Sequence, residues 1–517
     1  MSVAELLGQE LGSFSDLLHA RALEHGDRTA LVCGDQALTY AELDAVVERV
    51  AASLQRDGLQ PGEVVAICVS GWTMDAIAAL LGAVRAGGAA APIPTSLAPR
   101  SLVLLLKDSG ARVAFFDAKV WEPVKESGDE ILAKRIALDG SDAGEAFSTW
   151  LAPVGTRANE VAFDPDRPFN IIYSSGTTGV PKGIVHAHRM RWRQLRGLAY
   201  GADAVSLVSL SIYSNMALLS LLPTLTHGGT AVVMAKFDVG EFLRLAEDHR
   251  VTHAMMVPVQ VHRILEHPDF DRRDLSSFRM KHVAGAPFSV NMKSEVLRRW
   301  PGGLQESYGM TEGGGATGLA AHEFPHKLHT VGRPGPGTEI RIIDEDGREV
   351  ALGELGEVVG RSDNTMQRYH NQPERSREIE WVSPDGLTFI RTGDLGKLDE
   401  DGFLQLVDRK KDMIISGGFN IYPSDLEAEM IQHPQVLEAA VVGVASDKWG
   451  ETPVAFVALK PGATVTADEL KAWTNGKLGK TQRLADLILV DSLPRSHIGK
   501  VLKRELRDDY KGVALTA

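Results

Sequence analysis

Short apolar runs alternate with longer amphipathic stretches through the first 300 residues. Runs typical of buried strands cover residues 64–69, 89–93, 113–116, 205–210, 231–234, 252–257 and 280–284. Helical spacing covers residues 74–86, 100–109, 216–226, 239–249, 259–267 and 290–300. Strands that alternate with helices predict parallel sheets covered on both faces. We therefore expect an α/β fold whose large N-terminal domain holds doubly wound, mostly parallel sheets.

The pattern changes after about residue 331. Residues 339–343 and 357–360, with an Asp-Glu-Asp-Gly turn between them, predict short antiparallel strands of a small β-rich subdomain. After the charged run at residues 408–412, short helices and strands predict a small α+β domain that continues to the C-terminus. We expect an N-terminal domain over residues 1–408, a hinge at 409–411 and a C-terminal lid domain over 412–517.

Composition restricts the class of protein. The 517 residues are 44% hydrophobic and carry a net charge of −13, which is typical of a globular protein with two or three domains. The acidic balance argues against nucleic-acid binding, and no apolar run is long enough to span a membrane. The two cysteines lack metal-binding or redox spacing, and the first 15 residues lack the positive segment of a signal peptide. We expect a cytoplasmic protein.

A segment rich in glycine and hydroxyl groups follows the apolar run at residues 169–173. Its members are Ser174, Ser175, Gly176, Thr177, Thr178, Gly179, Lys182 and Gly183. Glycines let backbone N–H groups approach an anion, hydroxyls add donors, and the lysine adds a positive charge. Pro181, and the lack of a Gly-Lys-Ser/Thr ending, exclude a Walker A loop. The segment predicts a cradle for a triphosphate; the alternative is an ordinary surface loop.

Residues 305–312, Gln-Glu-Ser-Tyr-Gly-Met-Thr-Glu, form a second motif after a predicted helix. Thr311 and Glu312 offer hard oxygens suited to Mg²⁺, and Tyr308 offers an aromatic face for a purine. The alternative is a polar loop. The three glycines at 313–315 either leave space beside a site or form a loose loop.

Two further motifs lie nearer the C-terminus. Asp394, in Arg-Thr-Gly-Asp at residues 391–394, could bridge two ribose hydroxyls, although aspartate is also common in turns. Lys500 follows Gly499 in a loop, where a lysine is ordinarily solvated and becomes catalytic only beside other site residues.

A basic stretch at residues 189–196 predicts an exposed helix face, the alternative being contact with a phosphate-bearing tail of a substrate. The 16 histidines show no His-x-x-x-His spacing, so we expect no zinc site.

Together and in this order, the motifs resemble the class I adenylate-forming superfamily, which includes acyl- and aryl-CoA synthetases, luciferases and the adenylation domains of peptide synthetases. The resemblance covers essentially the whole chain. It implies an ATP-dependent acid–CoA ligase. A carboxylic acid and ATP would give acyl-AMP and pyrophosphate, and acyl-AMP and coenzyme A would then give acyl-CoA and AMP. The implied cofactors and co-substrates are ATP, Mg²⁺ and coenzyme A.

The resemblance also implies roles for individual residues. The catalytic residues are Lys500, Thr311, Glu312 and Lys182, with Lys500 orienting the carboxylate against the α-phosphorus. The nucleotide-binding residues are Ser174, Ser175, Gly176, Thr177, Thr178, Gly179, Gly285, Ala286, Pro287, Glu306, Ser307, Tyr308, Gly309, Asp394 and Arg409. The metal ligands are Glu312 and Thr177, and the hinge residue is Lys411. The acyl-pocket residues are Ile212, Tyr213, Met216, Ala284 and Gly285, and the CoA-binding residues are Gly417, Gly418, Trp449 and Arg483.

Trp449 and Arg483 resemble lid residues that contact CoA in the 4-chlorobenzoate-CoA ligase branch. The segment at residues 211–216 lacks the aspartate usual in amino-acid-activating domains, and Ser214 stands where the family usually has histidine. The apolar pocket residues favour an aromatic or arylalkanoic acid. A medium- or long-chain fatty acid, a carrier protein in place of CoA, and a regulatory nucleotide-binding protein are the alternatives. The oligomeric state is open, with a homodimer as one candidate.

Overall fold

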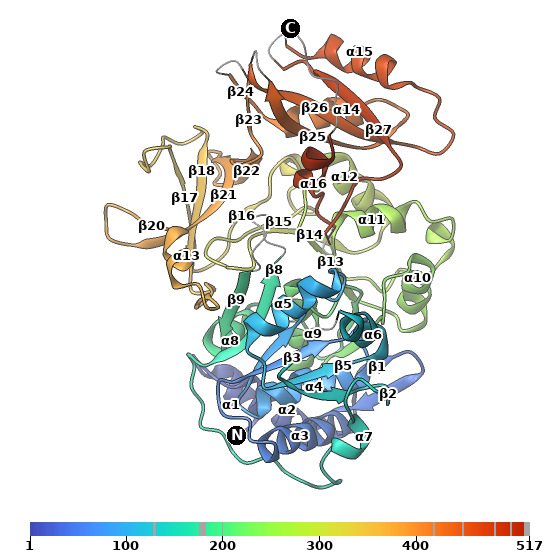
Figure 1. Ribbon diagram of the computed structural model, residues 1–517, viewed down its shortest axis with the longest axis vertical. Coiled ribbons are helices and arrows are strands. Elements are labelled where there is room, and N and C mark those ends of the chain that lie inside the picture. Colours follow the sequence, from blue (N-terminus) through green and yellow to red (C-terminus); the bar gives the residue numbers. More distant parts are fainter. Residues whose placement is uncertain are drawn as a thin grey trace.

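The computed structural model describes residues 1–127, 131–174, 182–198, 200–416, 419–446, 449–479, 482–496 and 499–510. In these residues the strands form four sheets (Figure 1). The blue to green elements form the lower part of the molecule in this view, and the red C-terminal elements lie at the opposite end of its long axis.

One sheet has nine strands in the order β16-β15-β14-β13-β12-β10-β11-β1-β2. They are β1 (Thr29–Cys33), β2 (Gln36–Thr39), β10 (Val205–Val208), β11 (Thr230–Val233), β12 (His253–Met256), β13 (Met280–Ala284), β14 (Gly303–Tyr308), β15 (Thr317–Ala320) and β16 (Arg333–Pro334). The strands from β1 through β14 in this order pair in parallel, and antiparallel pairs occur at both edges. The carboxyl ends of β10, β12, β13 and β14 therefore meet at one edge, where ligands bind in open α/β sheets.

A second sheet has eight strands in the order β19-β9-β8-β4-β3-β5-β6-β7. They are β3 (Val64–Cys68), β4 (Ala89–Pro92), β5 (Val113–Phe116), β6 (Lys134–Ala137), β7 (Glu145–Ala146), β8 (Pro168–Ser174), β9 (Lys182–Ala187) and β19 (Arg368–Tyr369). In this order the strands from β8 to β7 pair in parallel, whereas β9 runs antiparallel to β8.

Helices cover both sheets and fill the space between them. They are α1 (Val3–Gly8), α2 (Phe14–His25), α3 (Tyr40–Arg56), α4 (Met74–Arg85), α5 (Pro99–Ser109), α6 (Ala118–Glu126), α7 (Phe147–Trp150), α8 (His188–Gly197), α9 (Asn215–Thr226), α10 (Val239–Asp248), α11 (Pro258–Leu265) and α12 (Val290–Arg299), with 3-10 turns at Phe270–Arg272 and Pro325–Lys327. Helix α4 is buried on almost all sides. Its apolar residues share one core with strands β1, β3 and β8 and with helix α9. This common core holds the two sheets together.

A small antiparallel sheet follows. It contains β17 (Thr338–Ile343), β18 (Gly356–Ser362), β20 (Glu380–Val382), β21 (Thr388–Leu398) and β22 (Leu404–Arg409), with α13 (Pro373–Glu378) beside it. Strand β19 leaves this part of the chain to pair with β9, so the small sheet and the phosphate-loop strands are joined directly.

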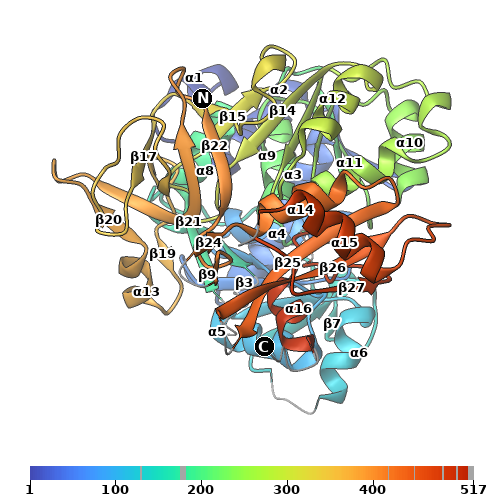
Figure 2. The same cartoon turned by 90° about the horizontal axis from the view of Figure 1, so that it is seen from above.

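The C-terminal region has its own sheet and its own core. The sheet contains β23 (Ile414–Ser416), β24 (Phe419–Ile421), β25 (Val436–Ser446), β26 (Gly450–Leu459) and β27 (Asp486–Val490), and the helices are α14 (Pro423–Ile431), α15 (Ala467–Lys477) and α16 (Lys503–Asp509). Seen from above, these orange and red elements lie over the N-terminal domain (Figure 2). The predicted division at residues 408–412 stays a prediction, although β22 ends and β23 begins close to it.

The expected fold class is confirmed: a large α/β domain with mostly parallel sheets, a β-rich part and a small α+β C-terminal domain. Residues 305–308 lie in strand β14 and residues 391–394 in strand β21, so these residues do not form the polar loop or the turn that the sequence left open as alternatives. Within the described residues, no helix has the length and apolar character needed to cross a bilayer.

Candidate active site

Lys500 is presented by a tight loop between β27 and α16. Arg495 and Val501 form an isolated β-bridge across the loop. The backbone N–H of Ser496 donates to the carbonyl of Lys500 at 2.8 Å, and the backbone N–H of Lys500 donates to the Ser496 hydroxyl at 3.2 Å. These bonds fix the backbone of Lys500, so its side chain leaves the C-terminal domain from a defined point.

Gly499 is the contact between this loop and the N-terminal domain. Its φ of +79° is unfavourable for residues with a side chain. A Cβ here would lie 3.0 Å from Val259 Cγ1 and 3.6 Å from Val257 Cγ2. Val257 directly follows β12 at the sheet edge described above. The loop therefore rests on the carboxyl end of the nine-stranded sheet, and both the backbone conformation and the limited space favour a glycine at this position.

The Lys500 ammonium lies among charged side chains of the N-terminal domain. Its pKa is lowered to about 8, mainly by burial and then by the positive charge of Arg409. The carboxylates of Asp394 and Glu312 oppose this lowering, and Lys411 adds to it. Interactions of this kind require proximity. The structure thus brings Lys500 together with Asp394, Glu312 and Arg409, although they come from distant parts of the sequence.

Asp394 is held by two neighbours. Its Oδ2 accepts a hydrogen bond from the Tyr308 hydroxyl at 2.8 Å, and its Oδ1 pairs with Arg409 Nε at 3.1 Å. Asp394 and Arg409 face each other in the register of β21 and β22. Burial and the Asp394 charge raise the pKa of Tyr308 well above its usual value, so the phenol stays protonated and donates.

Glu312 is fixed from the side of the second sheet. Its Oε1 accepts a hydrogen bond from the Tyr369 hydroxyl at 2.8 Å, and its carbonyl accepts one from Met366 N–H at 2.7 Å. Lys182 Nζ lies 5.2 Å from the centroid of the same Tyr369 ring. Tyr369 therefore connects the lysine that ends the phosphate loop with the carboxylate of the second motif.

The three glycines after Glu312 are places of close backbone contact, which decides between the two alternatives left open by the sequence. A Cβ on Gly313 would lie 1.8 Å from the carbonyl oxygen of Asn364. A Cβ on Gly314 would lie 2.9 Å from the carbonyl oxygen of Gly360, and one on Gly315 would lie 2.7 Å from Gly360 Cα. The segment is packed against the small antiparallel sheet.

The phosphate loop is only partly within the described residues. Ser175, Gly176, Thr177, Thr178 and Gly179 lie outside them, as do Gly417 and Gly418 of the predicted CoA site. For Ser174 the backbone alone is described. Ser174 and Lys182 are paired in the antiparallel ladder of β8 and β9, so the two ends of the loop lie side by side.

Two predicted acyl-pocket residues, Gly285 and Met216, lie near Val257, which also contacts the Gly499 position. Gly285 has φ +91°, and a Cβ on it would lie 3.2 Å from Met216 Sδ and 3.6 Å from Val257 Cγ1. Ile212 and Tyr213 are buried, at 1% and 8% exposure. Val257 contacts the positions of both Gly285 and Gly499, so it belongs to this group although the sequence did not single it out.

Two family models match the chain. A model described as AMP-binding enzyme matches residues 18–370, and one described as AMP-binding enzyme C-terminal domain matches residues 425–500. The chain belongs to the AMP-binding enzyme family. The resemblance to class I adenylate-forming enzymes is thereby confirmed, as is the expectation that the chain is an enzyme of the acyl- and aryl-CoA ligase type.

Known relatives resemble this AMP-binding enzyme over almost its whole length. 4-coumarate–CoA ligase 3 of Oryza sativa subsp. japonica is 33% identical over 506 residues, covering 94% of this chain and 90% of the relative. Feruloyl-CoA synthase of Amycolatopsis sp is 35% identical over 507 residues, covering 96% and 99%. The ATP-bound crystal structure of MatB from Rhodopseudomonas palustris has a TM-score of 0.86 at 29% identity, covering 96% of this chain and 99% of MatB.

Not every predicted residue of this AMP-binding enzyme faces the Lys500 cluster. Glu306 is buried in an ion pair with Lys293 of α12, and burial raises its pKa to about 7. Lys293 Nζ also donates to the carbonyls of Leu328 at 2.7 Å and Thr330 at 3.1 Å. The Glu306 carboxylate is therefore held by Lys293 and is not among the proposed nucleotide contacts.

Other predicted residues lie at the surface. Ser307, Pro287 and Gly309 are exposed, whereas Ala284 and Ala286 are partly buried. Trp449, at the turn between β25 and β26, is 51% exposed, and Arg483 is exposed on the C-terminal domain.

The predicted hinge residue lies next to the nucleotide cluster. Lys411 as a whole residue is exposed, but its amine is partly buried, and this burial, followed by the charge of Arg409, lowers its pKa. The preceding Lys410 is anchored to the N-terminal domain. Its Nζ lies 3.2 Å from Glu357 Oε2, and its backbone N–H donates to the Gly393 carbonyl at 2.9 Å.

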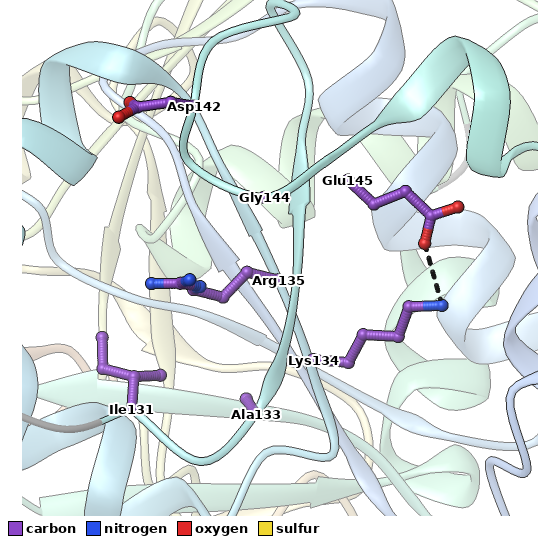
Figure 3. Close-up of a pocket in the computed structure, with 7 residues that line it drawn as sticks. All are labelled: Ile131, Ala133, Lys134, Arg135, Asp142, Gly144 and Glu145. Carbon is purple, nitrogen blue, oxygen red and sulfur yellow. Dashed lines mark ion pairs between the residues drawn. The ribbon is translucent and has the colours of Figure 1, made fainter.

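A hollow at β6 and β7 lies at the other end of the eight-stranded sheet from β19 and β9 (Figure 3). It is lined by Ile131, Ala133, Lys134, Arg135, Asp142, Gly144 and Glu145. Lys134 Nζ pairs with Asp57 at 2.7 Å and with Glu145 at 3.1 Å, and Arg135 lies 4.1 Å from the centroid of the Trp121 ring. Because Lys134 and Arg135 already have these partners, the hollow does not resemble the site around Lys500.

Sequence reasoning missed Tyr369, His186 and Val257. Tyr369 lies in a two-residue strand without a motif, and its role depends on β19 crossing to β9. Val257 carried one signal, since it precedes Pro258 at the end of an apolar run. His186 lies in β9 and bonds the Thr311 carbonyl at 2.7 Å, a contact that spacing alone does not reveal.

Proposed function

We propose that this enzyme is an ATP-dependent carboxylic acid–CoA ligase that acts on aromatic or arylalkanoic acids. The observation that carries the proposal is the meeting of Lys500, from the C-terminal domain, with Glu312 and Asp394 of the N-terminal domain. A cation at a junction with two carboxylates and a predicted phosphate cradle is suited to activating a carboxylate with a nucleotide.

In the proposed complex the Lys182 ammonium and the loop before it bind the β- and γ-phosphates of ATP. Tyr308 lies against adenine, and the Asp394–Arg409 pair binds the ribose hydroxyls. Thr311 contacts the α-phosphate. The support is that Tyr308, Asp394 and Arg409 already contact one another, so the nucleoside would meet a preorganised surface.

The Glu312 carboxylate fits a ligand for Mg²⁺. It offers a hard oxygen, Tyr369 orients it, and among the described residues no cation forms an ion pair with it. Thr177 is the second proposed ligand. When bound, the ion would supply positive charge next to the phosphates.

In the first proposed step, a carboxylate oxygen of the acid forms a bond to the α-phosphorus, and the bond from that phosphorus to the bridging oxygen breaks. Pyrophosphate leaves with the bridging oxygen. Lys500 holds the acid and compensates charge on the α-phosphoryl oxygens; nearby substrate anions favour its charged form. In the second step, the CoA sulfur bonds to the acyl carbon, the acyl–oxygen bond breaks, and AMP leaves.

An aromatic substrate is supported by the apolar group around Met216 and Gly285 and by relatives that are named for 4-coumarate and ferulate. Tyr213 and Ile212 add apolar surface. A medium- or long-chain fatty acid remains the second substrate class, and a carrier protein the second acceptor.

A pyrophosphate-release screen with ATP and Mg²⁺ tests the proposal. The acids are 4-coumaric, ferulic, 3-phenylpropanoic, benzoic, octanoic and palmitic acid, each with and without CoA. We expect pyrophosphate and AMP with the aromatic acids and an acyl-CoA mass when CoA is present. Faster turnover of palmitate would favour the fatty-acid alternative. Acyl transfer only to a carrier protein would replace CoA as the acceptor, and no pyrophosphate with any acid would overturn the proposal.

A further inference from the structure

Arg191 of α8 is a buried cation whose partners are all neutral. Its side chain is 1% exposed, against the exposed helix face expected from the sequence. Its Nε donates to Asn170 Oδ1 at 2.8 Å, and its Nη1 donates to Gln194 Oε1 at 2.9 Å. Burial lowers its pKa to about 9, and no carboxylate in the described part of the chain pairs with it. A charge kept from water without an acid costs free energy.

One arm of Arg191 reaches the second motif through His186. Nη2 donates to His186 Nδ1 at 2.8 Å. Because a guanidinium can only donate, Nδ1 accepts and the ring proton sits on Nε2. Nε2 donates to the Thr311 carbonyl at 2.7 Å. Burial and the Arg191 charge lower the pKa of His186 well below its usual value, so the ring stays neutral and keeps this direction of bonding.

The same Nη2 atom also bonds a residue next to the acyl pocket. Arg191 Nη2 also donates to Asn215 Oδ1 at 2.7 Å. Asn215 is the first residue of α9 and directly precedes Met216, which contacts the Gly285 position. Helix α8 packs against both α9 and β9, which carries His186 (Figure 1). One guanidinium group therefore holds the backbone beside Glu312 and the start of the acyl-pocket helix.

We propose that Arg191 is a positioning residue for adenylation, which fixes the Thr311 carbonyl through His186 and the acyl-pocket helix through Asn215. The proposal rests on the proposed function and deepens it. Arg191 touches no substrate. It sets the distance between the loop assigned to the α-phosphate and the pocket assigned to the acid, the two groups that must meet in line.

Lys281 provides a matched control, because it is also a buried cation with neutral partners. Its Nζ donates to the carbonyls of Trp300 at 2.9 Å, Pro301 at 2.5 Å and Gly302 at 2.8 Å, just after α12. Lys281→Met removes a basic side chain that is buried to a similar degree and that bonds the carbonyls just after α12. It leaves the hydrogen bonds of Arg191 to His186 and Asn215 in place. It therefore reports what loss of a structural cation does to this fold.

The kinetic test separates the two arms. His186→Phe should lower kcat of acid-dependent pyrophosphate release about tenfold while the KM of the acid stays within about twofold. Asn215→Ala should raise the KM of the acid about fivefold with kcat nearly unchanged. Arg191→Met should show both effects. In the double variant, His186→Phe should lower kcat little beyond the effect of Arg191→Met, because Arg191→Met already removes the hydrogen bond that orients His186. His186→Gln keeps a donor toward Thr311 and should recover most of kcat.

Amide hydrogen exchange gives a readout that needs no turnover. Arg191→Met should speed exchange about tenfold in the segments 309–313 and 212–217, and His186→Phe only in 309–313. Lys281→Met should leave both segments as in the wild type. Unchanged exchange in both segments of Arg191→Met, or identical kinetic losses in Arg191→Met and Lys281→Met, would overturn the inference. A wild-type enzyme that releases no pyrophosphate with any acid would overturn the proposed function instead, and the exchange result would still decide the role of Arg191.

Discussion

Replacement of Gly499 by alanine tests whether adenylation uses the docked loop. Two costs follow from the geometry. A φ of +79° costs a residue with a side chain about 1 kcal/mol wherever the C-terminal domain lies. The new Cβ would also lie 3.0 Å from Val259 Cγ1, and crowding of this kind costs about 1–3 kcal/mol, but only when the loop rests on the N-terminal domain. The second cost alone corresponds to a loss of about 5- to 150-fold in the docked population.

The assay compares the two half-reactions. Gly499→Ala should lower kcat/KM of pyrophosphate release by about 5- to 150-fold and should affect thioester formation from supplied acyl-AMP far less. Gly462→Ala is the control, because Gly462 has φ +80° in the same domain with nothing within 4 Å of the added Cβ. Val259→Ala makes room and should recover most of the loss in the double variant. If Gly499→Ala behaves as Gly462→Ala does, the contact with Val259 has no part in adenylation.

Three further predictions follow from the site. Lys500→Ala should cut adenylation at least about 100-fold and spare thioester formation, and equal loss of both half-reactions would contradict the assigned role. In the wild type, kcat/KM of adenylation should fall as pH rises through about 8, where the ammonium of the free enzyme loses its proton. Tyr308→Phe removes a buried donor to Asp394 and should raise the KM of ATP about tenfold without changing the KM of the acid, as measured by initial rates. Glu306→Gln should lower the melting temperature less at pH 8 than at pH 5.5, because the raised Glu306 pKa of about 7 means that the folded wild type loses stability as this carboxyl ionises with rising pH, whereas the amide does not titrate; a larger loss at pH 8 would contradict the raised pKa.

The parallel sheets could be predicted because their strands are buried on both faces and therefore form continuous apolar runs. Strand β5, which is buried at every position, matches its predicted range; β13 matches as well, although Lys281 and His282 interrupt its apolar run. Strand β14 escaped prediction because its sequence is polar, with Gln305, Glu306 and Ser307 in succession. Only the tertiary partner Lys293 makes a buried glutamate tolerable there.

The candidate site was predictable as a set of motifs but not as an arrangement. Phosphate-loop, carboxylate and lysine motifs each have a local chemical meaning, whereas the meeting of Lys500 with Asp394 depends on how two domains lie. The basic stretch of α8 shows the same limit. Its arginines look alike in sequence, yet Arg191 points into the core while Arg189 pairs with Asp166 at the surface.

The glycines that follow Glu312 mark a part of the site where close packing disfavours any side chain. There the main chain lies against the main chain of Asn364 and Gly360, so the backbone next to the metal-ligand candidate leaves no room for side chains at these three positions. The opposite wall, around Met216 and Tyr213, is made of side chains. Mutation can reshape that wall, and with it the choice of acid, without displacing the carboxylate, so new substrate preferences can arise while the chemistry is conserved.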